Sequence, residues 1–161
     1  MLSRASRLFR LRLPSAVLAV ALALGLAVAP GSAAQAALPT CNSFVYKDGY
    51  NAYGSVSVRV PVWREPYEPG YTLDCDLRSG NYNNTAVRIL QETLNHCYWN
   101  IIGAQLTADG DFGTKTRDAL IKVQRHHGIL ADGGYGPQTR KTVYHHGLAT
   151  NEGAGTCGRL W

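Results

Sequence analysis

The spacing of apolar residues in the first half of the chain is typical of a β-strand. Four valines alternate with other residues at a period of two: Val56, Val58, Val60 and Val62. Pro61 has no N–H to give to a sheet ladder, so it places this strand at a sheet edge or at a bulge. Asp48-Gly49 and Gly54 supply turn residues before the strand. We therefore predict a small β-hairpin or a strand-and-loop segment.

From Asn83 onward the apolar spacing becomes helical. The residues of the predicted buried face are Val87, Leu90, Leu94 and Cys97. Their spacings of 3, 4 and 3 place them on one side of a helix. Asn83 or Asn84 can cap the first turn of this helix.

Two further helices are predicted downstream. One runs from Thr114 to His127 and ends at Gly128, because glycine favours the left-handed conformation that follows many helices. Its inward residues are Ala119, Leu120 and Val123. The next begins at Pro137, which suits a first turn, and extends to Gly147 around Val143.

One short sequence precedes both of these helices. Residues 109–117 read DGDFGTKTR, and residues 132–140 read DGGYGPQTR, 23 positions further on. Each Asp-Gly pair predicts a tight turn, at Asp109-Gly110 and at Asp132-Gly133. Each unit is too small to bury its own apolar face, so two units and the leading helix are expected to share one core.

The remaining residues of each unit have predicted structural roles. Phe112 and Tyr135 are expected to enter the core, and Gly113 and Gly136 to cap the following helix or allow close backbone approach. Two glutamines each follow an inward apolar residue: Gln91 and Gln124. A buried glutamine there can bond loop carbonyls and amides that would otherwise lack partners.

The N-terminal residues predict secretion. Basic residues between Arg4 and Arg12 precede a 14-residue apolar run, which is shorter than the about 20 residues of a membrane span. The run leads to Ala34-Gln35-Ala36, a small-x-small cleavage pattern, so residues 1–36 are predicted to be a signal peptide. Pro39 and Thr40 before Cys41 do not fit a lipidation motif, so we expect no stable membrane anchor after cleavage.

Signal removal changes the charge. The chain has 16 Lys and Arg against 11 Asp and Glu, and four Arg lie in the signal, so 12 − 11 leaves +1. This charge supports no polybasic surface for nucleic acid.

The cysteines predict two disulfides. The four residues are Cys41, Cys75, Cys97 and Cys157. An even number in a small secreted protein, without a C-x-x-C pair, favours disulfides over zinc. Three pairings exist. We favour Cys41–Cys75 with Cys97–Cys157, which would staple the N-terminal element and separately pin the C-terminal tail to a helix.

The ordered motifs resemble the three-helix peptidoglycan-binding domain family. Its pattern is V-x-x-L-Q-x-x-L-N, then D-G-x-F-G-x-x-T, a helix ending in an apolar residue and Gln, and D-G-x-x-G-P-x-T. The matching residues are Val87, Leu90, Gln91, Leu94, Asn95, Asp109, Gly110, Phe112, Gly113, Thr116, Val123, Gln124, Asp132, Gly133, Gly136, Pro137 and Thr139. The resemblance covers about residues 77–148. The layout is also similar to that of small secreted actinobacterial proteins.

This resemblance implies a mainly α protein with a compact three-helix domain. The expected organisation is a signal peptide at 1–36, a partly β and aromatic-rich extension at 37–76, the domain at 77–148 and a C-terminal tail at 149–161. The implied function is secreted, non-catalytic binding of peptidoglycan by a monomer, through its glycan strand or its stem peptides. The alternatives are a secreted interaction or inhibitor module on the same scaffold, and an uncharacterised wall hydrolase.

Neither a metal site nor an active site is predicted. The five histidines lie at predicted helix ends, where they complement the helix dipole. Asp109 and Asp111 begin like a calcium loop, but Leu120 stands where its final Glu is needed. The chain has no G-x-S-x-G or H-E-x-x-H motif, so we expect no enzyme activity and no cofactor.

Ligand contacts are assigned to the two repeated loops and to the extension. The candidate residues are Asp109, Asp111, Arg117, Asp132, Tyr135, Arg140 and Trp63. The loop N–H groups can receive oxygens of a ligand, and the two arginines can pair with stem-peptide carboxylates or remain ordinary solvated residues. The Tyr135 hydroxyl is expected to reach the surface. Aromatic residues of the extension either bind sugars or build a small β core.

The signal peptide and disulfides give the first testable prediction. Mass spectrometry of the chain recovered from culture medium should show a start at about Ala37 and no free thiol. A chain that retains Met1, or that releases two reactive thiols on non-reducing unfolding, would contradict these assignments.

Overall fold

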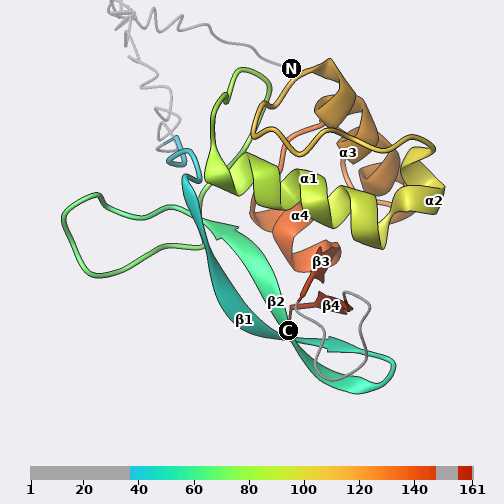
Figure 1. The fold of residues 1–161 in the computed structure, drawn as a ribbon, viewed down its shortest axis with the longest axis horizontal. Helices are drawn as coiled ribbons and strands as arrows, with labels where there is room; N and C mark the ends of the chain where they lie inside the picture. Colours follow the sequence, from blue (N-terminus) through green and yellow to red (C-terminus); the bar gives the residue numbers. More distant parts are fainter. Residues whose placement is uncertain (1–36, 148–155, 161) are drawn as a thin grey trace, which may run out of the picture. The chain divides into compact units, whose positions relative to one another are not determined.

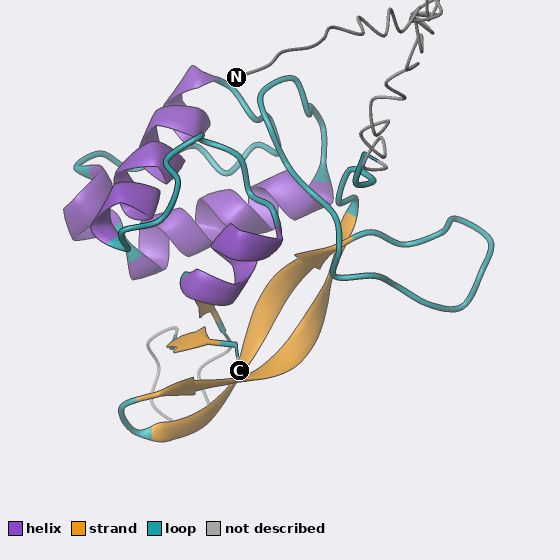
Figure 2. Ribbon diagram, turned by 180° about the vertical axis from the view of Figure 1, so that it is seen from behind, coloured by secondary structure: helices purple, strands orange, loops and turns teal. Residues whose placement is uncertain are grey.

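The computed structural model describes residues 37–147 and 156–160, which fall within one compact unit, Ala36–Trp161. Its elements are β1 (Ser43–Asn51), β2 (Gly54–Val62), α1 (Thr85–Cys97), α2 (Trp99–Ile102), α3 (Thr114–His126), α4 (Pro137–Thr142), β3 (Tyr144–His146) and β4 (Cys157–Arg159). The helices gather on one side of the long β1–β2 hairpin (Figures 1 and 2). Within the described ranges, no helix is long and apolar enough to cross a membrane. The predicted signal peptide at 1–36 lies outside them.

The predicted hairpin is present, but its turn lies further along the chain. β1 and β2 pair antiparallel from Ser43 opposite Val62 to Asn51 opposite Gly54. The turn expected at Asp48-Gly49 is wrong, because this pair lies inside β1. Gly49 suits the strand, since a Cβ there would already lie 3.1 Å from a Val58 methyl carbon. β2 ends the strand order β2-β1-β4-β3, which is the edge position that Pro61 predicts.

The two ends of this sheet meet. β4 pairs with β1 through Arg159 and Tyr50, and β3 pairs with β4 over its three residues. Gly147, which follows β3, forms an antiparallel bridge with Val58 of β2. This single bridge closes the sheet at Val58 and leaves Pro61, three residues further along β2, at the edge.

The expectation of a mainly α protein is wrong. The described residues form four helices and a four-stranded antiparallel sheet. The third predicted helix ends at Thr142, because Val143 turns to an extended conformation with φ −81° and ψ 156°. The following residues pair with β4, and the buried His145 lies within 2.9 Å of the Arg140 carbonyl through Nε2. The histidines of β3 thus do not lie at a helix end.

The first two predicted long helices are confirmed as α1 and α3. Asn84 caps α1, because its side chain accepts from the N–H groups of Ala86 and Val87. Gly128 follows α3 with φ +66°, as predicted. The inward residues of both helices join one core cluster with the aromatic residues of the repeated loops.

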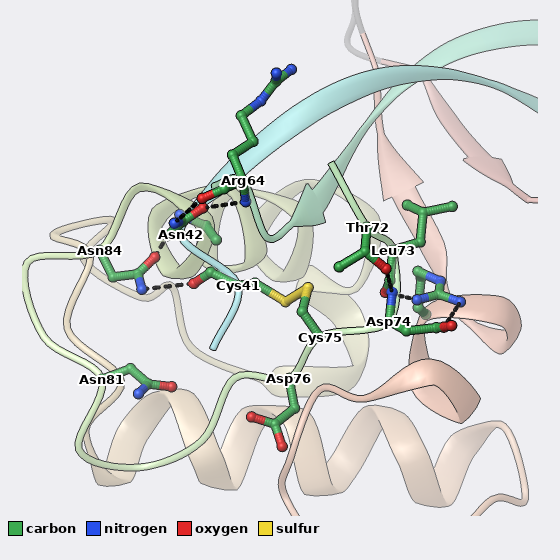
Figure 3. The surroundings of a disulfide bond; sticks show 12 residues. Cys41, Asn42, Arg64, Thr72, Leu73, Asp74, Cys75, Asp76, Asn81 and Asn84 are labelled. Atoms are coloured by element: carbon green, nitrogen blue, oxygen red, sulfur yellow. Dashed lines mark hydrogen bonds and ion pairs between the residues drawn. A yellow bond between two sulfur atoms is a disulfide. The ribbon is translucent and has the colours of Figure 1, made fainter. Parts of the chain in front are cut away.

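Both disulfides have the favoured pairing, Cys41–Cys75 and Cys97–Cys157. The first holds the base of loop 64–71, an exposed loop that projects away from the hairpin (Figure 1). Figure 3 shows Asn42 bonded to Arg64 at this base, with each backbone contact at 2.9 Å. The second disulfide holds β4 against the end of α1.

Closure of the sheet requires a glycine at position 147. A Cβ there would lie 2.3 Å from the Ser57 carbonyl oxygen, which no side chain tolerates without backbone movement. Gly147→Ala should therefore reduce the free energy of unfolding by roughly 1–3 kcal/mol, measured by urea denaturation. Gly134→Ala is the matched control, because its Cβ would meet no atom closer than 3.6 Å. Equal stability of the two variants would refute the close approach.

Candidate binding site

The first repeated loop is organised by the side chain of Gln91. Its Nε2 donates to Asp109 Oδ1 at 2.9 Å, to the Asp111 carbonyl at 3.0 Å and to Thr116 Oγ1 at 3.1 Å. Its Oε1 accepts the N–H of Gly110 at 2.9 Å. The carboxamide thus satisfies buried groups on both sides of the turn, as the sequence predicts.

The second repeated loop contains the same arrangement around Gln124. Its Nε2 donates to Asp132 Oδ1, the Gly134 carbonyl and Thr139 Oγ1 at 2.9, 2.9 and 3.0 Å. Its Oε1 accepts the N–H of Gly133 at 2.8 Å. Gly110 and Gly133 have φ of +85° and +74°, which explains the glycine in both turns. The two loops are therefore equivalent in hydrogen bonding as well as in sequence.

The segment 77–81 pairs with the aromatic residue of each loop. Leu77 and Tyr135 exchange both backbone hydrogen bonds, at 2.9 and 2.8 Å. Phe112 donates to the Asn81 carbonyl at 2.7 Å and accepts from Gly80 at 3.3 Å. The N–H groups at the centres of both loops are therefore used within the protein, and they are not free to receive a ligand.

Three of the predicted ligand residues lie inside the protein or pack against it. Arg140 is 4% exposed, and its guanidinium donates to the Leu73 carbonyl and pairs with Asp74. Tyr135 is 1% exposed, so its hydroxyl does not reach the surface as expected, and burial raises its pKa. Trp63 is partly buried and packs against the core.

The other predicted ligand residues remain accessible. Asp109, Asp111 and Asp132 are all exposed. The Asp111 N–H and then the Gln91 amide lower the pKa of Asp109, because both donate to its carboxylate. Arg117 is half-exposed, and its side chain runs over the second loop, where a Cβ on Gly133 would lie 2.7 Å from its Cγ.

Three depressions follow one another along one side of α1. The first, of about 320 Å³, is lined by Asn83, Asn84, Thr85, Arg88, Asp109 and Gly110. The second, of about 240 Å³, is lined by Gln91, Leu106, Thr107, Asp109, Asp111, Gly113, Thr114, Lys115 and Thr116. The third, of about 370 Å³, is lined by Asn95, Trp99, Gly103, Ala104 and Gln105.

The helix residues in these depressions form a single stripe. They are Asn84, Arg88, Gln91, Asn95 and Trp99, at spacings of three or four. Arg88, Gln91 and Asn95 lie on one face of α1, which spans about 20 Å at 1.5 Å per residue. Asn84 is the N-cap of α1, and Trp99 begins α2 after the break at Tyr98. The segment 103–111 forms the opposite side of this row, which we call the α1 groove.

The α1 groove differs in charge along its length. Arg88 and Lys115 are exposed cations beside Asp109 and Asp111 in the first two depressions. This end can pair with both carboxylates and amines of a ligand. Arg88, Lys115 and Trp99 were not among the ligand residues predicted from the sequence. The spacing of three or four residues from Asn84 to Trp99 could have indicated one side of the groove. The other side is a loop whose position is known only from the fold.

The histidines contact aromatic rings and a tyrosine hydroxyl. His96 and His146 stack with ring centroids 4.1 Å apart, and His127 Nε2 lies 2.8 Å from the Tyr98 hydroxyl. Burial, with His96 and Arg59 nearby, lowers the pKa of His146 to about 4. Among the described residues, no three His, Cys, Asp or Glu side chains converge as metal ligands.

Comparison with known proteins assigns part of this region to a family. Residues 83–143 match the family described as "Putative peptidoglycan binding domain". This match contains both repeated loops and the whole α1 groove.

Two relatives match segments of 36 and 74 residues. N-acetylmuramoyl-L-alanine amidase CwlM of Mycobacterium tuberculosis is 47% identical over 36 residues, 22% of this chain and 9% of that protein. Zinc D-Ala-D-Ala carboxypeptidase of Streptomyces albus G is 38% identical over 74 residues, 46% of this chain and 28% of that protein. The matched segments thus span less than a third of either relative's length.

A solved structure is also similar. It is a peptidoglycan-binding protein from Clostridioides difficile in complex with glutamine hydroxamate. It is 25% identical with a TM-score of 0.39, over 60% of this chain and 54% of that chain.

The Gln91 network predicts a specific loss of stability. Gln91→Met keeps a side chain of similar length but leaves the buried Gly110 N–H without its acceptor. The free energy of unfolding should fall by about 1–3 kcal/mol, measured by urea denaturation. Gln138→Met, at an exposed position of α4, should change it by less than about 0.5 kcal/mol. A Gln91→Met protein as stable as this control would show that the loop does not need the carboxamide.

Proposed function

We propose that this protein, whose residues 83–143 belong to the peptidoglycan-binding domain family, holds peptidoglycan at the cell wall without cleaving it. The family match is the observation that carries the proposal, because it contains the ordered Gln and Asp-Gly motifs and not only a general helical pattern. The domain boundaries proposed are those expected from the sequence, with a signal peptide at 1–36 and the domain at 77–148.

The shape of the α1 groove supports a polymeric ligand. Peptidoglycan is an extended chain, and its recognition favours a row of shallow sites over one closed pocket. The three depressions form such a row along about 20 Å of helix. We place the wall contact in this groove, with Asp109 and Asp111 retained from the predicted ligand residues.

The charges of the groove suit stem peptides. These peptides carry free carboxylates, and some carry a free amine. Arg88 and Lys115 can pair with the carboxylates, and Asp111 can pair with the amine. Exposed pairs are individually weak, so several along one groove are needed for useful affinity.

The disulfides support a location outside the cytosol. Bonds such as Cys41–Cys75 and Cys97–Cys157 persist in oxidising compartments and are rare in a reducing cytosol. The predicted signal peptide leads to the same compartment, in which peptidoglycan lies.

The residues of the groove support the proposed non-catalytic role. The relatives that match this chain are named as hydrolases, but each shares only a minor part of its length with it. Asp109 is engaged by the Asp111 N–H and by Gln91, which holds it as an ionised turn residue and not as a proton donor.

Loop 64–71 favours the alternative of an interaction module. All of its residues are exposed, and Tyr67 near its tip is 95% exposed. The paired backbone of Trp63 and Thr72 fixes its base, so the loop is presented from a stable support. An interaction module of this kind has no need to bind the wall, so sedimentation with peptidoglycan separates the two functions.

The charged end of the α1 groove gives a test of wall binding. The wild-type protein should sediment with purified insoluble peptidoglycan and release no soluble muropeptides. Arg88→Ala combined with Lys115→Ala should weaken sedimentation by about tenfold or less, and added salt should weaken wild-type binding in the same direction. Both side chains are exposed, so the melting temperature should not change.

A control with the same change of charge is available. Arg125→Ala combined with Lys141→Ala removes two exposed cations that line none of the three depressions. Equal loss in both double variants would indicate non-specific attraction. A wild-type protein that stays in solution would refute the function, and muropeptide release would establish the hydrolase alternative.

A further inference from the structure

Trp99 is an aromatic residue that the packing of this protein does not use. Its neighbour Tyr98 is 3% exposed, and the Tyr98 hydroxyl contacts His127 and the N–H of Tyr144. Cys97 on the other side is tied to Cys157. Trp99 itself is 72% exposed at the start of α2, although tryptophan is strongly buried on average. The chain thus anchors both preceding residues and leaves the indole at the surface.

The surface beside Trp99 is hollowed and neutral. Gly103, with φ +77°, ends α2 and turns the chain so that Ala104 and Gln105 come back beside the indole. The resulting depression has a volume of about 370 Å³, and none of the described residues that line it carries a charge. It therefore differs in chemistry from the Arg88 and Lys115 end of the same groove.

The depression has two side-chain carboxamides, of which one is hydrogen-bonded within the protein and the other can bond a ligand. The Asn95 carboxamide is held by the protein through both its nitrogen and its oxygen, because it exchanges two 2.8 Å hydrogen bonds with the Leu106 backbone. Gln105 is exposed, and its carboxamide makes no hydrogen bond within the described part of the chain. An NH2 donor group and a C=O acceptor are thus presented next to an aromatic face and the Ala104 methyl group.

We propose that the Trp99 depression is a subsite for an N-acetylated sugar ring of a glycan strand. The indole face packs against the C–H groups of the ring, as aromatic side chains do with amphipathic ligands. The Gln105 carboxamide is complementary to the acetamido group, because its C=O can accept from the acetamido N–H and its NH2 can donate to the acetamido C=O. Ala104 supplies an apolar contact for the acetyl methyl.

The absence of charge in the subsite favours a sugar over a stem peptide as its ligand. A stem peptide brings carboxylates, which would lose solvation beside Trp99 without gaining a cation. A neutral sugar loses little solvation free energy there, and its hydroxyls stay in contact with water because the depression is open. The assignment rests on the proposed wall-binding function, and it places the glycan strand at the Trp99 end of the α1 groove.

The test uses a soluble oligomer of N-acetylglucosamine, which has neither stem peptides nor charge. Isothermal titration calorimetry of the full secreted chain should show binding, and Trp99→Ala should weaken it by about tenfold or more. Trp99→Phe should retain part of the affinity, and Gln105→Ala should lose less than Trp99→Ala. Leu130→Ala is the matched control, because Leu130 is an exposed apolar residue, 70% accessible, away from this depression.

The outcomes separate this subsite from the function on which it rests. Trp99→Ala should melt at the wild-type temperature, so that loss of binding is not loss of fold. Wild-type protein that sediments with peptidoglycan but ignores the oligomer would overturn the sugar subsite and leave wall binding intact. Equal affinity of Trp99→Ala and wild type, or equal loss in Leu130→Ala, would also overturn it. Oligomer binding that needs Trp99, without sedimentation on peptidoglycan, would support the subsite and refute wall binding.

Discussion

A tight turn that enters a protein core takes backbone N–H and C=O groups away from water, and each of them then needs a partner. In this protein a single glutamine carboxamide meets that need in each repeated loop. Gln91 and Gln124 each bond the loop's Asp side chain, a loop carbonyl, a threonine hydroxyl and a glycine N–H. The loops can therefore carry Phe112 and Tyr135 into the core, where both are almost fully buried. Without these bonds, burial of the aromatic residues would leave the adjoining backbone unpaired.

The same constraint ties the extension to the helices. The segment 77–81 accepts and donates the backbone bonds of both loop aromatics, so it must lie between the two loops. Arg140 donates to the Leu73 carbonyl and pairs with Asp74. The Cys41–Cys75 disulfide joins this segment to the residues just before β1. Asn84, which caps α1, also donates to the Cys41 carbonyl at 2.8 Å, as Figure 3 shows. The hairpin is thus held to the helices by covalent and polar contacts in addition to its buried valines.

Sequence patterns predicted the elements whose structure depends on their own residues. The valine alternation of β2, the face of α1 and the Asp-Gly turns follow from residues close together in sequence. The glutamine networks join residues 8 to 25 positions apart, and they were predicted because each glutamine follows an inward apolar residue of its helix. The third helix was predicted too long, because the extended conformation of β3 depends on pairing with β4, and the three residues of β4, Cys157–Arg159, have no alternating pattern that would predict a strand. From the sequence, Arg140 was predicted to be an accessible ligand residue. Its burial depends on contacts with residues 73 and 74, which only the fold brings against it. The groove beside α1 was not predictable for the same reason, since its far side comes from the loop after α2.

The two repeated units share a scaffold, but they differ in length at one place. Gln91 precedes its loop Asp by 18 residues, whereas Gln124 precedes its loop Asp by 8. The ten additional residues of the first unit include α2 and the turn at Gly103, and they create the depression beside Trp99. In the second unit the chain passes directly from α3 to its loop, and the side chain of Arg117 packs over Gly133. The repeated hydrogen bonds therefore explain why both units fold alike, and the inserted residues explain why the α1 groove belongs to the first unit. The depression that we propose as a sugar subsite therefore depends on residues that the second unit lacks, whereas the buried hydrogen-bond network is the same in both units.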